Sequence, residues 1–443
     1  MGNIGRLATL AAALLVLAGA AGVISVLGVF AGSDDRDTSR VAAVESPSDQ
    51  AIARLQRVAE SSPQNSESLA ALGFAYLQKA RESGDPAFYS KADGVFQKTL
   101  SLEPAIPFGL LGASALSLGR HDFQEALAWA DHAFEAAPGD PDAYAARGDA
   151  LVELGRYEEA LDAYQGMLDA RPDINAYLRV AYLRELHGDS DGASETMLEA
   201  IEAARPTGET AAWAHYQLGN LYFNTGNLKE AEAQYEASLK AFPGYVHALA
   251  GLARIAAVNG DYAEAIDLYD RVVTRQPVLE YVAALGDVYH AAGRDAEAQR
   301  QYGLVTAIES IYKTNGINTD LEMALFLADH PAAEGHIEEA VTQARAVYET
   351  QPGSIRANDV LSWALYQSGR FEEALVYSQQ AVRLGTQDPI LLFHAGMINY
   401  RLGNDATARD YLERTLGANP RFSVLHTQEA TTALAELKAS VHR

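Results

Sequence analysis

The chain has 443 residues, no cysteine, and 34 basic against 59 acidic side chains, which gives a formal net charge of −25. This excess of negative charge opposes binding to phosphate backbones and anionic headgroups, so a nucleic-acid-binding function is not expected. Without cysteine, disulfides, thiolate metal sites, cysteine nucleophiles and lipoprotein anchors are excluded.

The N-terminal region contains one long apolar stretch, from Leu7 to Ala31, without a charged residue. At ~1.5 Å rise per residue it is long enough to cross a ~30 Å hydrocarbon core. We therefore predict an uncleaved transmembrane signal anchor over residues 7–31. A cleaved signal peptide is the alternative, because small residues end the strings 18–20 and 29–31 where a signal peptidase cuts.

Charges on either side of this stretch predict its orientation. Arg6 and the amino terminus precede it, and three aspartates follow it within residues 34–37. The positive-inside rule then gives a cytoplasmic tail at 1–6 and places the rest outside the cytoplasm, at the plasma (inner) membrane; after cleavage it would be secreted or periplasmic. Residues 32–48 are polar and acidic without apolar periodicity, which predicts a disordered tether.

A repeat dominates the chain after the tether. Similar local strings, such as 155–160, 260–265 and 369–374, each end in an alanine. These alanines recur with a commonest spacing of 34 residues, a proline often stands twelve residues later, and a small residue often stands twelve residues earlier. A period of this length is typical of a solenoid whose helical units bury their faces by stacking. The marker alanines are Ala51, Ala92, Ala126, Ala160, Ala193, Ala231, Ala265, Ala298, Ala340, Ala374 and Ala408.

This pattern resembles the tetratricopeptide repeat, and the unit from Pro141 to Pro172 matches it closely through Tyr144, Gly148, Gly155, Tyr157 and Tyr164. The resemblance implies an all-α, right-handed solenoid of about ten helix-turn-helix repeats. We expect an N-terminal block at 49–311, an irregular connection at 312–319, a C-terminal block at 320–420, and a capping helix within 421–443. A half unit precedes the ten full repeats. The last third is also similar to bacterial repeat proteins without an assigned activity.

No catalytic constellation accompanies the repeats. The chain has no glycine-rich phosphate loop, nucleophile elbow or zinc-protease histidine pair, so we expect no enzyme activity and no cofactor. His330 and His336 lie near several carboxylates at an inter-helix turn. We expect them to be solvated turn residues, with a divalent ion as the alternative.

Function is therefore expected at a surface. In a stack of this kind the first helix of each unit lines the concave side, and aromatic residues there suit binding of a peptide segment. The alternative is that these rings only pack within the superhelix. The predicted groove residues form a first patch, Leu178, Tyr182, Trp213, Tyr216, Asn220 and Phe223, and a second patch, Trp363, Tyr366, Ile390, Phe393, Met397 and Tyr400.

Together these features predict a non-enzymatic, extracytoplasmic scaffold or adaptor, tethered to the membrane by its N-terminal helix. Its expected partners are proteins or peptides, chiefly envelope or secreted proteins, and not nucleic acid. The alternative is a small-ligand or metal-binding protein that uses residues 308–339.

Overall fold

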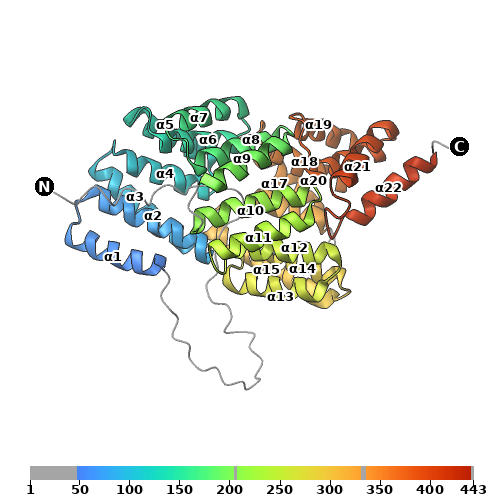
Figure 1. Ribbon diagram of the computed structural model, residues 1–443, viewed down its shortest axis with the longest axis horizontal. Helices are drawn as coiled ribbons and strands as arrows, with labels where there is room; N and C mark the ends of the chain where they lie inside the picture. The colour runs from blue at the N-terminus through green and yellow to red at the C-terminus, as the bar shows by residue number, and fades with distance from the viewer. Residues whose placement is uncertain (1–46, 204–206, 331–335, 441–443) are drawn as a thin grey trace, which may run out of the picture.

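The computed structural model describes residues 47–203, 207–330 and 336–440, and every regular element in these ranges is an α-helix (Figure 1). The helices are α1 (Pro47–Ser61), α2 (Ser66–Ser83), α3 (Ala87–Leu102), α4 (Pro107–Gly119), α5 (Phe123–Ala136), α6 (Pro141–Glu153), α7 (Tyr157–Ala170), α8 (Ile174–Leu186), α9 (Ser190–Ala203), α10 (Glu209–Asn224), α11 (Leu228–Ala241), α12 (Val246–Asn259), α13 (Tyr262–Arg275), α14 (Leu279–Ala291), α15 (Asp295–Thr314), α16 (Asp320–Asp329), α17 (His336–Thr350), α18 (Ile355–Gln367), α19 (Phe371–Ala381), α20 (Pro389–Arg401), α21 (Asp405–Ala418) and α22 (Thr427–Ser440).

The helices form a solenoid of consecutive pairs. Each of the ten pairs from α2/α3 to α20/α21 packs closely within itself, with α1 before them and α22 after them. This arrangement confirms the prediction of about ten repeats between a half unit and a C-terminal helix. The predicted membrane segment at 7–31, its cytoplasmic tail at 1–6 and all but the last residues of the tether at 32–48 lie outside the described residues. No helix in the described part is long and apolar enough to cross a bilayer.

The pair α6/α7 shows how the sequence sets each boundary. The Asp140 carboxylate caps α6 by accepting a hydrogen bond from the Asp142 N–H, and Pro141 occupies the first turn, where a missing N–H costs nothing. Gly155 then takes a left-handed conformation, with φ of 74°, between the two helices. Glu158 and Glu159 lie in the first turn of α7, where negative charge stabilises the helix N-terminus.

Small residues allow the two helices of a pair to approach. The marker Ala160 is fully buried, and so are its equivalents from Ala92 to Ala408. A Cβ at Gly148 would lie less than 3.0 Å from the Tyr164 ring, and Gly219 and Gly286 have the same relation to their own tyrosines. The glycine therefore makes the space that the ring fills, as the repeat pattern predicts.

The connection in the middle is shorter than expected. α15 continues to Thr314, so only residues 315–319 of the predicted 312–319 link are non-helical. α15 barely contacts α16, whereas other consecutive pairs pack against each other. The regular stacking is therefore interrupted at this point.

The array also contacts itself over long sequence distances, because helix ends and loops of later units meet those of earlier units. The Ile355 N–H donates a 2.9 Å hydrogen bond to the Tyr157 hydroxyl, 198 residues away. The Asn419 side chain donates one of 2.7 Å to the Phe223 carbonyl. Gly155 faces the backbone of Gly353 so closely that a Cβ on it would lie less than 3.0 Å away. We call these contacts, which join Tyr157 to Ile355, Phe223 to Asn419 and Gly155 to Gly353, the seam.

Candidate peptide-binding cleft

A cleft of about 50 Å³ lies near the N-terminal end of the array, between residues of α2, α4, α6 and α8 and the end of α7. A single water needs about 10–15 Å³ of such space. The cleft therefore has room for a few waters or for one side chain of a partner.

The floor of the cleft is apolar. α4 contributes Phe108, Leu111, Ala115 and Leu118, which follow one another at helical spacing on one face. The ring of Phe74, from α2, stacks on the Phe108 ring with centroids 4.7 Å apart. Both rings are only half-buried, so they keep apolar surface available to a ligand.

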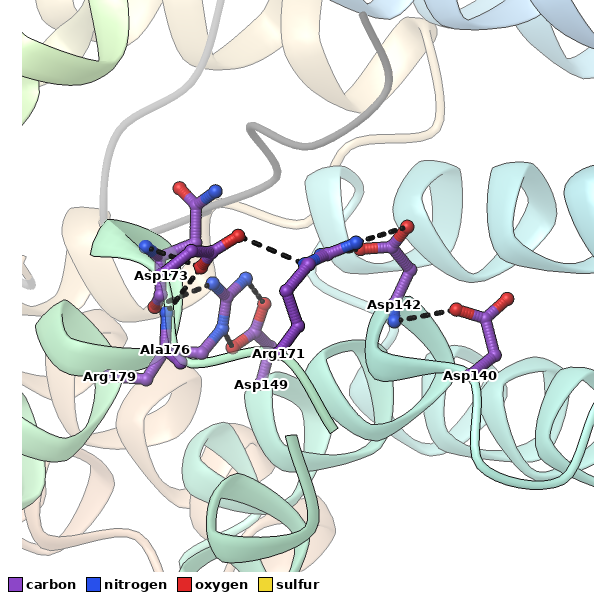
Figure 2. A network of polar contacts seen from close by, with 8 residues as sticks. Asp140, Asp142, Asp149, Arg171, Asp173, Ala176 and Arg179 are labelled. Carbon is purple, nitrogen blue, oxygen red and sulfur yellow. Dashed lines mark hydrogen bonds and ion pairs between the residues drawn. The ribbon is translucent and has the colours of Figure 1, made fainter. Parts of the chain in front are cut away.

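Charged residues form one edge of the cleft, and Figure 2 shows how they are held. The Arg171 guanidinium lies between two carboxylates: it donates to Asp142 and forms a 2.9 Å ion pair with Asp173. Beside them, Arg179 donates two hydrogen bonds of 2.7 Å to the two oxygens of Asp149. Because both guanidinium groups are already paired, this edge does not present a free positive charge.

The Arg179–Asp149 pair is deeply buried, with side-chain exposures of 4% and 7%. Tyr164 donates a further hydrogen bond of 2.9 Å to the same carboxylate. Burial raises the pKa of Tyr164 well above its ordinary value, and the adjacent carboxylate raises it further. Burial alone would lower the pKa of Arg179, but the Asp149 charge outweighs it and raises that pKa. The Arg179 guanidinium thus keeps its charge, and its hydrogen bonds to Asp149 fix α8 to α6.

Asn175 supplies the polar group that the protein does not use. Its residue is 7% exposed and lines the cleft, yet its side-chain amide makes no hydrogen bond within the described part of the chain. Only its backbone is engaged, since its N–H donates to Asp173 and its carbonyl accepts from Arg179. An amide can both donate to and accept from a peptide backbone, so Asn175 is suited to bind one.

Neither of the two predicted patches includes a residue of this cleft. A signal for it was present, because Phe108, Leu111, Ala115 and Leu118 occupy the inward positions of the second full repeat. The predicted groove covers only the two patches in which aromatic residues cluster at inward positions.

Within the first predicted patch, two residues belong to the core. Leu178 is 3% exposed and Phe223 is 1% exposed, and the Arg254 guanidinium covers the Phe223 ring at 3.8 Å. Tyr182, Trp213 and Tyr216 are half-buried. As the array stands, a ligand reaches at most these last three rings.

Asn220 in the same patch is already bonded within the protein. Its side-chain oxygen accepts hydrogen bonds from the Tyr235 hydroxyl at 2.8 Å and from Arg254 at 3.0 Å. The expectation that Asn220 is free to bond a peptide backbone is therefore wrong for this oxygen, because neighbouring helices occupy it.

The second predicted patch is mostly core. Trp363 and Phe393 are fully buried, Met397 is 3% exposed and Tyr366 is 7% exposed, while Ile390 and Tyr400 are half-buried. The Trp363 indole N–H donates to Asp329 at 2.7 Å. We had placed these residues on an open surface, but helices and loops from α16 to α22 pack over them, as the packing alternative describes.

The two histidines of the metal alternative do not form a site in the described residues. The ring nitrogens of His330 already interact with the Phe326 carbonyl at 2.8 Å and with Asp287 at 2.7 Å. No group of three or more histidine, aspartate or glutamate residues in the described ranges is placed to hold a metal ion. Residues 331–335, between the two histidines, lie outside those ranges.

A second, smaller cavity of about 20 Å³ lies where the two halves of the array meet. His121 and Glu153 line it from the N-terminal side, and Glu322, Gln351 and Arg356 line it from the C-terminal side. Burial raises the pKa of Glu153, although the nearby Arg356 guanidinium opposes this shift. At this size the cavity has room for one or two waters, which could connect the polar side chains of the two halves of the array.

Comparison with known proteins identifies the repeat. Family models described as tetratricopeptide repeat match residues 117–184, 216–280 and 360–421. Anaphase-promoting complex subunit 7 of Arabidopsis thaliana is 24% identical over 236 residues, which are 53% of this chain and 40% of that protein. The chain thus spans well under two thirds of this relative.

Lipopolysaccharide assembly protein B of Escherichia coli K12 is 24% identical over 279 residues, which are 61% of this chain and 69% of that protein. Among solved structures, a human IFIT1 dimer with PPP-AAAA aligns over 75% of this chain and 77% of its own, with 16% identity and a TM-score of 0.48. These matches identify tetratricopeptide repeats at residues 117–184, 216–280 and 360–421, and the ten helix pairs show the same repeated architecture along the described array.

Proposed function

We propose that this protein is a non-enzymatic scaffold that holds a peptide segment of a partner protein in the cleft between α2, α4, α6 and α8. The observation that carries the proposal is the side-chain amide of Asn175, which lines the cleft beside an apolar floor and stays open to a ligand. An extended or helical segment fits this combination, because one apolar side chain occupies the floor while the amide bonds its backbone.

We further propose that the scaffold works outside the cytoplasm, held at the membrane by residues 7–31, and that its partners are envelope or secreted proteins. Two observations support this proposal. The uncharged stretch is followed by acidic residues. One relative, 69% of which this chain covers, is named for lipopolysaccharide assembly.

Site-specific photo-crosslinking in cells tests the binding site. We expect a crosslinkable residue at Ala146, in the cleft, to give a discrete covalent adduct with a partner. The matched control position is Val376 on α19, which is 59% exposed and lies away from the cleft. The adduct should weaken when Asn175→Ala is added. The proposed site would be contradicted by equal adduct yields from the two positions, or by an adduct yield at Ala146 that does not change when Asn175→Ala is added.

A reporter fused after Arg443 tests the location separately. A reporter that is active only outside the cytoplasm should be active, and mass analysis of the protein should show an uncleaved N-terminus. Activity of a cytoplasmic reporter alone would refute the proposed topology while leaving the cleft untouched.

A further inference from the structure

The edge of the cleft carries more negative than positive charge. Among the described residues, Asp142 and Asp149 line the cleft and Asp140 and Asp173 belong to the same polar network, which thus holds four carboxylates and two guanidinium groups, those of Arg171 and Arg179 (Figure 2). Two of the carboxylates cap helix N-termini, each of which carries about half a positive charge. Allowing for both termini, the edge still keeps about one negative charge.

This negative charge is accessible to a ligand. The side chains of Asp142 and Asp173 are 34% and 31% exposed, and they hold Arg171 between them (Figure 2). The Asp149 carboxylate, by contrast, is covered and fully used by Arg179 and Tyr164. A cation that approaches the cleft therefore meets the partly exposed carboxylates of Asp142 and Asp173, which have lone pairs left beyond those used by Arg171 and by the N–H groups that Asp173 caps.

We propose that the cleft selects a segment in which an apolar residue is closely followed by lysine or arginine. This inference rests on the proposed function and specifies the chemistry of the partner. The apolar side chain packs on Phe108 and Leu111, Asn175 bonds the segment's backbone, and the basic side chain lies against Asp142 and Asp173. The net charge of −25 for the whole chain attracts such a segment over longer distances.

An acidic segment is disfavoured by the same geometry. In the part of the chain that the structure describes, the cationic groups at this edge are Arg171 and Arg179, and each already lies against a carboxylate at close range. Binding an acidic residue would mean breaking one of these pairs and leaving an aspartate uncompensated. The two arginines of this cleft therefore hold the carboxylates in position and are not available to bind an anionic side chain.

A random dodecapeptide phage library, selected on the full-length protein, tests the inference. Clones that also bind Ala146→Phe, in which a ring fills the cleft, are removed. We expect the surviving peptides to share an apolar residue with lysine or arginine within three positions. Replacing that basic residue by glutamate should weaken binding about fivefold or more at low salt, and less in 0.5 M salt.

Two variants separate the roles of the edge and the amide. Asp142→Asn should reduce the preference for the basic residue, whereas Asp162→Asn, at an exposed position on α7, should leave it unchanged. Asn175→Ala should weaken all selected peptides about five- to tenfold regardless of their charge. If no peptide depends on the open cleft, the proposed function itself fails. If peptides bind the cleft but are acidic or show no charge preference, the proposed function stands and this inference is overturned.

Discussion

Removing the Asp149 carboxylate is the sharpest test of how the cleft is held. Asp149→Ala leaves the Arg179 guanidinium buried without its two 2.7 Å hydrogen bonds and deprives the Tyr164 hydroxyl of its acceptor. Breaking a buried pair by removing one partner costs about 3–5 kcal/mol, because the remaining charge stays in a poorly solvated place. In a solenoid most of this cost falls on the units that contain the pair and their neighbours.

Native-state hydrogen exchange measures this effect locally. A loss of about 3 kcal/mol corresponds to amide exchange faster by roughly 100-fold, and we expect it in α6, α7 and α8. The control is Glu159→Ala, which breaks an exposed pair with Arg156 and should change stability by less than about 1 kcal/mol.

A double variant tests the physical reason. Asp149→Leu combined with Arg179→Met removes both buried charges and should recover most of the lost stability. The explanation from an uncompensated charge is refuted if the double variant is as unstable as Asp149→Ala. It is equally refuted if Asp149→Ala exchanges no faster than Glu159→Ala.

Two further predictions concern pH and the seam. Burial, together with the neighbouring carboxylate of Asp388, which caps α20, raises the pKa of Glu185 to about 7, so the native state holds this proton more tightly than the unfolded chain does. The stability that Glu185 contributes is therefore present below about pH 4.5 and is lost as pH rises through 7. We expect Glu185→Gln to raise the melting temperature at pH 8 and to change it little at pH 4.5. The control is the exposed Glu195→Gln, which should leave the melting temperature unchanged at both pH values. At the seam, Gly155→Ala and Gly260→Ala both force alanine into positive φ, but only the first meets backbone, that of Gly353. We expect small-angle scattering to show expansion for Gly155→Ala alone; equal expansion of both variants would contradict a role for the seam.

The repeat architecture could be derived from the sequence. Marker alanines such as Ala160 and Ala408 are fully buried, and glycines such as Gly148 lie against tyrosine rings, as the spacing predicted. These contacts join the two helices of one unit or adjacent units. A pattern with a period of 34 residues reports them directly, because each unit repeats the same local packing.

The accessibility of each inward position could not be derived in this way. Trp363 and Asn220 both stand at inward positions of their repeats, which the sequence pattern placed in an open groove. Trp363 is instead buried in the core, and the side chain of Asn220 is hydrogen-bonded to Arg254. Contacts across the seam, such as that between Tyr157 and Ile355, join residues 198 apart, which is close to six repeats. Whether such loops meet depends on the summed rotation of all the units between them, so a small change per unit moves them far apart. The sequence by itself determined the units and their internal packing, while only the tertiary structure decided which part of the concave face stays open, because that depends on how the units add up in space.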